Sequence, residues 1–129
     1  MDPQQALTIL VVEDDEGIRT ITSLLLESEG YRVHAVPNGE AACQWLQQQQ
    51  PNVLFADVNM PGMSGVEVAR RAREAYPSLH ILLTSGEGRA DPAWLAHGVH
   101  YLNKPYDRRA LLQAIDAVVR SSPAARVRA

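Results

Sequence analysis

Residues 52–62 read Asn-Val-Leu-Phe-Ala-Asp-Val-Asn-Met-Pro-Gly, an apolar run that ends in a carboxylate and then breaks into a turn. Within it, residues 53–56 show no alternation of polar and apolar side chains, which is typical of a strand covered on both faces of a sheet. A carboxylate at the end of a core strand is costly to desolvate. Asp57 is therefore the first candidate for a functional residue.

Three more short apolar runs also end in polar side chains. These side chains are Glu13 and Asp14 after the first run, Ser85 after another, and Lys104 after the last. The strand ends thus carry acids, a hydroxyl and an amine. If the strands lie in one sheet, these groups form one site.

Apolar runs typical of strands alternate five times with patterns typical of helices. Strands are expected at 7–12, 31–36, 53–56, 79–84 and 99–103. Five helices are expected to follow them, with N-caps at Asp15, Asn38, Ser64, Asp91 and Asp107. The alternation predicts an α/β fold, a doubly wound parallel sheet with helices on both faces. Ligands of such sheets bind at the carboxyl ends of the strands, where the polar groups above lie.

The expected helices carry apolar stripes that should face the sheet. The stripe of the first helix is Ile18, Ile21 and Leu25, and that of the last is Leu111, Leu112, Ile115, Val118 and Val119. Gly30 is expected to end the first helix. The fourth helix is expected to be short, at about residues 92–97, with a first-turn proline.

Length and charge fit one globular domain. The 129 residues are enough to bury a core, and we expect the domain to span residues 1–120, followed by a disordered tail at 121–129. The net charge of −3 gives no electrostatic reason to bind nucleic acid directly or an anionic membrane surface.

The sequence shows no pattern typical of a targeting signal or of a membrane span. The N-terminal residues lack the basic and then apolar segments of a signal peptide, and no apolar run approaches the roughly 20 residues that span a bilayer. The single cysteine, Cys43, excludes an internal disulfide and fits a reducing compartment. We therefore expect a cytoplasmic protein without membrane insertion.

The chemistry of the proposed site follows from its charges. Three carboxylates held together repel one another, and a hard divalent cation such as Mg²⁺ relieves that repulsion. A carboxylate can also act as a nucleophile and accept a phosphoryl group. Such a transfer needs charge neutralisation, which Lys104 and a cation could supply, while the Ser85 hydroxyl could bind a phosphoryl oxygen. The residues thus indicate a metal-assisted aspartyl-phosphate site.

Four segments in this order resemble the receiver domains of two-component response regulators. They are residues 10–14 (Leu-Val-Val-Glu-Asp), 55–65 (Phe-Ala-Asp-Val-Asn-Met-Pro-Gly-Met-Ser-Gly), 83–86 (Leu-Thr-Ser-Gly) and 101–105 (Tyr-Leu-Asn-Lys-Pro). The resemblance runs from about residue 7 to residue 119, nearly the whole chain. It implies a flavodoxin-like, five-stranded sheet with strand order 2-1-3-4-5 and five helices.

The resemblance implies a role for each residue of the acidic site. Asp57 is similar to the phosphoacceptor, and Glu13 and Asp14 match the acidic pair. Asp14, Asp57 and the main-chain carbonyl of Asn59 match the protein ligands of Mg²⁺, with Mn²⁺ as a substitute. Glu13 stands where aspartate is commoner in the family, which lengthens its reach to a water-mediated metal contact.

The resemblance also implies the residues that respond to phosphorylation. Lys104 matches the lysine that contacts the phosphoryl group, Pro105 the proline after it, which is often cis, and Tyr101 the switch aromatic. Ser85 matches the switch hydroxyl, although Thr84 is adjacent. Strand alternation lets only one of these two hydroxyls face the site, and counting from Pro77 favours Ser85.

Two further positions, two residues beyond Asp57 and beyond Ser85, set the lifetime of the phosphoryl group in this family. Here they are Asn59 and Glu87, a pair that resembles chemotaxis-type regulators, which lose phosphate quickly. The Thr-Ser-Gly segment is more similar to receivers attached to sensor kinases.

The resemblance implies a signalling switch rather than an enzyme with a separate substrate. A histidine kinase or phosphotransfer domain would donate the phosphoryl group, and an output partner that the sequence does not name would read it. The chain could be a stand-alone regulator or a receiver from a larger protein. Two alternatives are a small aspartyl-phosphate phosphatase, which usually needs a cap domain, and a nucleotide- or flavin-binding module, whose phosphates three acids would repel.

Overall fold

The computed structural model describes residues 7–86, 91, 93 and 98–121 of the chain. Its five strands form one parallel sheet in the order β2-β1-β3-β4-β5. The strands are β1 (Thr8–Val12), β2 (Arg32–Val36), β3 (Val53–Asp57), β4 (His80–Ser85) and β5 (His100–Asn103). The predicted fold class and strand order are confirmed.

Four helices are bounded within the described residues: α1 (Glu16–Ser28), α2 (Gly39–Leu46), α3 (Gly65–Ala75) and α5 (Arg108–Arg120). The predicted fourth helix, at about 92–97, lies outside the described residues except for Ala93, whose N–H donates to the Asp91 carboxylate at 2.9 Å. The predicted tail also lies outside them except for Ser121, which caps α5. Among the helices that the structure describes, none combines the length and the apolar character of a membrane span.

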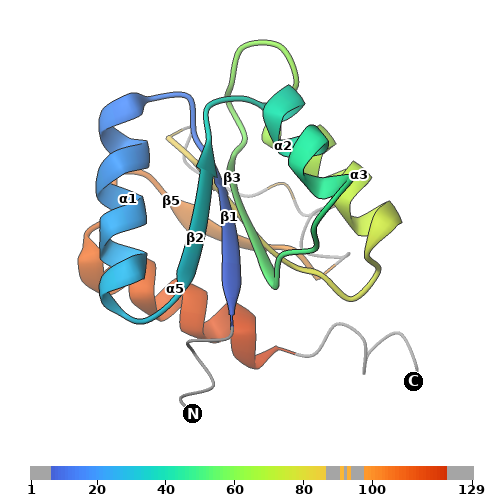
Figure 1. Cartoon of the computed structure of the whole chain (residues 1–129). Helices are drawn as coiled ribbons and strands as arrows, with labels where there is room; N and C mark the ends of the chain where they lie inside the picture. The colour runs from blue at the N-terminus through green and yellow to red at the C-terminus, as the bar shows by residue number, and fades with distance from the viewer. Residues whose placement is uncertain (1–6, 87–90, 92, 94–97, 122–129) are drawn as a thin grey trace.

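The helices cover the sheet as two layers, with α1 and α5 on one face and α2 and α3 on the other (Figure 1). Successive side chains of a strand point to opposite faces, so each strand feeds both layers. In β1, Ile9 and Val11 pack in the core under α1 and α5, whereas Leu10 and Val12 pack under α2 and α3. The uninterrupted apolar runs of the sequence follow from this double coverage.

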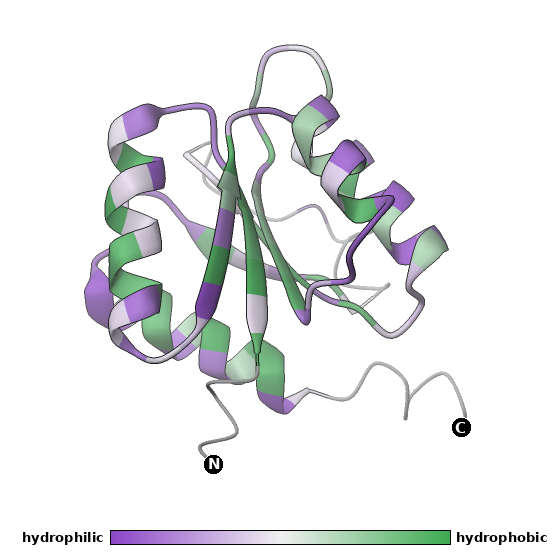
Figure 2. Ribbon diagram, in the orientation of Figure 1, coloured by the Kyte–Doolittle hydropathy of each residue, from purple (hydrophilic) through white to green (hydrophobic). Residues whose placement is uncertain are grey.

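Burial falls from the centre of the sheet to its edges. All residues of β3 are buried, as are all but the first of β1 and β4, while the edge strands β2 and β5 are partly exposed. The inner strands are accordingly the most hydrophobic part of the ribbon (Figure 2). The acid at the end of β3 therefore sits on the best-covered strand of the domain.

Four of the predicted N-caps are formed by the expected side chains. Each accepts a backbone N–H three residues later: Asp15 from Ile18 at 2.9 Å, Asn38 from Ala41 at 2.8 Å, Ser64 from Glu67 at 3.2 Å and Asp107 from Ala110 at 2.8 Å. Gly30 follows the end of α1 with a φ of 97°, a left-handed conformation that glycine adopts without strain. The N-caps of these four helices were thus predictable from the sequence.

The predicted apolar stripe of α1 was wrong at one position. Ile21 is 54% exposed, while Thr22 and Leu26 are fully buried against the sheet. Residues 24–26 are all leucine, so apolar side chains surround much of this helix and the pattern did not single out the buried row. In α5 the prediction held better, since Leu111, Ile115 and Val118 are buried.

An acid on α3 should make stability depend on pH. Glu67 pairs with Arg70 at 2.6 Å and Arg71 at 2.8 Å, and these hydrogen bonds lower its pKa to about 2 from 4.5. A lowered carboxyl pKa stabilises the fold above about pH 4.5, and that contribution is lost as the pH falls towards 2. We expect Glu67→Gln to be less stable than wild type at pH 7 in urea unfolding, with the difference shrinking below pH 4.5.

Glu74→Gln is the matched control, because among the described residues Glu74 pairs with one arginine, Arg70, at 2.9 Å. It should lower stability less than Glu67→Gln does, and added salt should weaken both effects. An effect of Glu67→Gln that stayed constant from pH 7 to pH 2 would contradict this assignment.

Candidate acidic site at the carboxyl edge of the sheet

The sheet brings the predicted polar strand ends together. Glu13 and Asp14 follow β1, Asp57 ends β3, Ser85 ends β4 and Lys104 follows β5. In the register of the sheet Val12 lies beside Ala56, Asp57 beside Thr84 and Ser85 beside Asn103. All four strands therefore finish at the same edge, within one or two residues of each other.

The Asp57 carboxylate is buried, with 4% of the residue exposed, and both of its oxygens accept hydrogen bonds. Its Oδ2 accepts from the Lys104 ammonium at 2.7 Å, and its Oδ1 accepts from the main-chain N–H of Asn59 at 2.9 Å. A charged donor and a backbone donor thus fix the carboxylate in one orientation.

Lys104 bridges two acids. Its Nζ lies 2.7 Å from Asp57 Oδ2 and 2.8 Å from Glu13 Oε1. Burial disfavours the ammonium, but the hydrogen bonds to Asp57 and Glu13 outweigh it and raise the pKa of Lys104. The lysine is therefore a permanent positive charge between the two carboxylates at neutral pH.

Glu13 is more buried than its acidic neighbour, with 3% exposed, whereas Asp14 is exposed. Burial raises the pKa of Glu13, and the hydrogen bonds from Lys104 and from the Asp15 N–H only partly oppose that effect. One carboxylate oxygen each from Glu13, Asp14 and Asp57 lie within 4.8 Å of one another. A cluster of three carboxylates with a single neighbouring ammonium fits a hard divalent cation.

The two adjacent hydroxyls of β4 point to different partners. Thr84 donates to the main-chain carbonyl of Leu102 at 2.7 Å, within the sheet. The Ser85 hydroxyl accepts from the side-chain amide of Asn59 at 2.9 Å. Ser85 therefore lies on the side of Asp57, as expected from strand alternation.

The remaining predicted residues surround Ser85 and Lys104. The Tyr101 hydroxyl donates to the main-chain carbonyl of Ser85 at 3.2 Å, and the Lys104–Pro105 peptide bond is cis. Glu87 lies outside the described residues.

Three residues that support the site were missed from sequence. The Thr22 and Tyr106 hydroxyls share a hydrogen bond of 2.8 Å, which ties α1 to the loop that carries Lys104. Arg19 donates to the main-chain carbonyl of Glu13 at 2.8 Å. The one signal in the sequence was a threonine within the apolar pattern of α1, but its partner lies 84 residues away.

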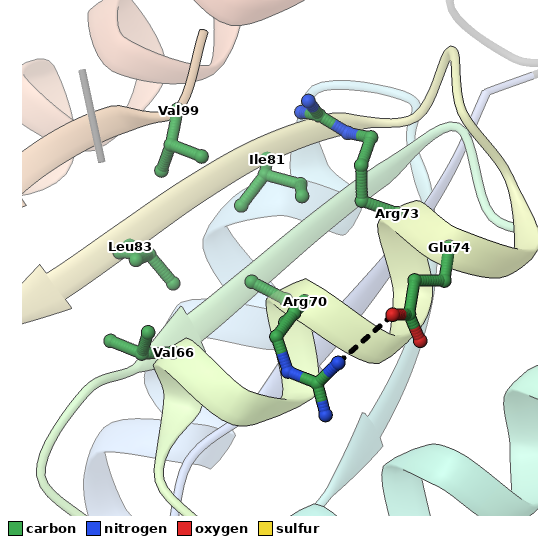
Figure 3. A pocket seen from close by; sticks show the side chains of 8 residues that line it. Val66, Arg70, Arg73, Glu74, Ile81, Leu83 and Val99 are labelled. Atoms are coloured by element: carbon green, nitrogen blue, oxygen red, sulfur yellow. Dashed lines mark hydrogen bonds and ion pairs between the residues drawn. The ribbon is translucent and has the colours of Figure 1, made fainter. Parts of the chain in front are cut away.

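A cavity of about 420 Å³ lies apart from the acidic cluster, between α3 and β4 (Figure 3). Its described lining comprises Val66, Ala69, Arg70, Arg73, Glu74, Ile81, Leu83 and Val99. None of these residues belongs to the acidic cluster.

Comparisons with known proteins agree with the geometry. A family model described as the response regulator receiver domain matches residues 9–116. The transcriptional regulatory protein CseB of Streptomyces coelicolor is 35% identical over 117 residues, which cover 87% of this chain and 49% of CseB. The response regulator protein FleR of Pseudomonas aeruginosa is 37% identical over 113 residues, covering 85% of this chain and 24% of FleR.

A solved structure matches over almost its full length. The chemotaxis response regulator CheY4 of Vibrio cholerae superposes with a TM-score of 0.80 at 30% identity, covering 87% of this chain and 98% of CheY4. The chain therefore spans about half of the curated relative CseB, but nearly all of CheY4.

Gly65 should be intolerant of a side chain because of its approach to Asp57. A Cβ at this position would lie 2.2 Å from the main-chain oxygen of Asp57. Backbone cannot yield as a side chain does, so we expect Gly65→Ala to cost about 1–3 kcal/mol or more in the free energy of unfolding. Gly86→Ala is the control, since a Cβ there meets nothing within 4 Å. Equal stability of the two variants in urea unfolding would refute this reading.

Cation binding should depend on pH through Glu13. Because burial raises the pKa of Glu13 above 4.5, protons compete with a cation at a higher pH than for an ordinary glutamate. We expect Mg²⁺ affinity, measured by calorimetry, to fall as the pH is lowered from 7 towards 4.5. In Glu13→Gln the affinity should be lower at pH 7 but should fall less. The same proportional loss in both proteins would argue against competition at Glu13.

Proposed function

The chain belongs to the response regulator receiver domain family, and from that premise we propose that Asp57 is the residue at which this domain accepts a phosphoryl group. One observation carries the proposal. Asp57 is a buried carboxylate at a strand end, held by a lysine and clustered with two further acids. A purely structural aspartate has no need of that combination.

The donor in this proposal is a phosphohistidine of a histidine kinase or of a phosphotransfer domain. A carboxylate oxygen of Asp57 forms a bond to phosphorus while the bond from phosphorus to the imidazole nitrogen breaks. The electron pair of the broken bond stays on the imidazole, so nothing is oxidised or reduced. The product is an acyl phosphate, a covalent state that a carboxylate nucleophile can form.

The residues around Asp57 supply charge and position for this transfer. Lys104 donates to the incoming phosphoryl oxygens with the ammonium that now binds Asp57 and Glu13. Asp14, Asp57 and the carbonyl of Asn59 hold Mg²⁺, or Mn²⁺, with Glu13 acting through a water. When bound, the cation neutralises phosphoryl charge. The oxygen cluster of the three acids supports this assignment.

The output of the domain is a change of surface. In the phosphorylated state the Ser85 hydroxyl binds a phosphoryl oxygen, and the Tyr101 side chain moves with Ser85. This movement alters the affinity of the domain for a partner. The hydrogen bond from Tyr101 to the Ser85 carbonyl supports the pairing of these two residues. In this scheme the domain catalyses its own phosphorylation and dephosphorylation, and has no separate substrate.

The surroundings of the domain are part of the proposal. Response regulators work with histidine kinases and with output domains, and this chain covers 49% of CseB and 24% of FleR. In this scheme a cognate histidine kinase and an output partner act with the domain in the cytoplasm. The phosphoryl group is short-lived, with Asn59 and Glu87 at the two positions that tune its lifetime.

The acceptor can be tested with a small donor. The chain is incubated with acetyl phosphate and Mg²⁺, and phosphoryl uptake is followed by intact mass. We expect uptake by the wild type, none above background in Asp57→Asn, and strongly reduced uptake in Lys104→Ala. Removal of Mg²⁺ with a chelator should abolish uptake by the wild type.

Asp15→Asn is the matched control for loss of a carboxylate. Asp15 caps α1, and asparagine caps helices equally well, so this variant should take up phosphate as the wild type does. Uptake by Asp57→Asn at the wild-type rate would disprove the assignment. Turnover of a panel of phosphomonoesters would instead favour the phosphatase alternative.

A further inference from the structure

The side chain of Asn59 has a partner that the proposed metal site does not require. Its main-chain N–H donates to Asp57 Oδ1 at 2.9 Å, while its side-chain amide donates to the Ser85 hydroxyl at 2.9 Å. Asn59 thus connects the acceptor carboxylate to the hydroxyl of β4 through two separate groups. The main-chain contact is open to any residue except proline, but the side-chain contact needs an amide or another donor.

We propose that the Asn59 side chain is a positioning residue that holds the Ser85 hydroxyl in its unphosphorylated place and so opposes the switch. The inference rests on the proposed function, because it concerns the hydroxyl that would bind the phosphoryl group. In this proposal the Ser85 oxygen moves towards the group on Asp57, and that movement breaks its contact with the Asn59 amide.

The contact joins a buried residue to an exposed one. Ser85 is 2% exposed, whereas Asn59 is exposed, so the hydrogen bond between them is partly buried. A hydrogen bond between neutral groups is worth about a fivefold change in an equilibrium. That is enough to change how readily the hydroxyl moves without fixing it in place.

The main chain of Ser85 is held independently. Its carbonyl accepts from the Tyr101 hydroxyl at 3.2 Å and from the Lys104 N–H at 3.0 Å. With the backbone anchored in β4, the hydroxyl changes partner by rotation of the side chain. The released hydroxyl thus belongs to the residue whose carbonyl contacts Tyr101, so the Tyr101 amide resonance lies close enough to report on the release.

A ligand that binds better to the released state must overcome the energy that favours the held state. Trifluoroberyllate, a phosphoryl mimic that binds to an aspartate without being hydrolysed, is such a ligand. Its affinity reports on the switch alone, whereas phosphoryl lifetime would also depend on how water reaches the acyl phosphate.

The test compares wild type with Asn59→Leu, which has a similar size and no side-chain donor, and with Asn59→Ala. Both variants keep the main-chain N–H that binds Asp57 and the carbonyl proposed for Mg²⁺. At saturating Mg²⁺ we expect the dissociation constant for trifluoroberyllate to fall by about fivefold in both. The Tyr101 amide resonance of each free variant should also move towards its position in the trifluoroberyllate complex of the wild type.

The same substitutions in a Ser85→Ala background complete a double-mutant cycle. Without the hydroxyl there is nothing for the amide to hold, so Asn59→Leu should then leave trifluoroberyllate affinity unchanged. Unchanged or weaker binding by both single variants would overturn the inference, as would an equal gain with and without the Ser85 hydroxyl. If wild type and Asp57→Asn bound trifluoroberyllate equally, the proposed function itself would fail, and the inference with it.

Discussion

The contact on which this site depends is the ammonium of Lys104 between two buried carboxylates, 2.7 Å from Asp57 and 2.8 Å from Glu13. Two acids that are 4% and 3% exposed would repel each other strongly without a positive charge between them. Removing one member of a buried ion pair typically costs about 3–5 kcal/mol, because it leaves a charge uncompensated. The lysine therefore offsets the repulsion between two buried carboxylates, and the proposed phosphoryl transfer would use that arrangement.

This contact constrains the whole fold. Glu13 follows β1, Asp57 ends β3 and Lys104 follows β5, which is separated from β3 by β4. Lys104 reaches both acids past the end of β4, where its main-chain N–H donates to the Ser85 carbonyl at 3.0 Å. The close approach of Gly65 to the Asp57 carbonyl packs the start of α3 against the same strand end. Strand order, strand length and side-chain size at the edge are thus linked through one site.

How much the sequence could predict depended on the distance between interacting residues. Uninterrupted apolar runs gave the strands, and side chains three residues from their partners gave the caps at Asp15, Asn38, Ser64 and Asp107. The meeting of Glu13, Asp57 and Lys104 followed from parallel strands ending at one edge, although strand order needed the family resemblance. The Thr22–Tyr106 bond could not be predicted, because 84 residues separate its partners. The exposure of Ile21 was missed because α1 is apolar on more than one side.

In the unphosphorylated protein, the groups that would receive a phosphoryl group are already engaged with one another. Lys104 binds the carboxylates, the Asn59 amide binds Ser85, and the Tyr101 hydroxyl binds the Ser85 carbonyl. Under the proposed function, phosphorylation of Asp57 would therefore exchange partners within an existing network, rather than assemble a new one. An exchange leaves a small net difference between two states, even though each contact is strong. Single hydrogen bonds within such a network, as between Asn59 and Ser85, can then decide how far the balance lies towards either state.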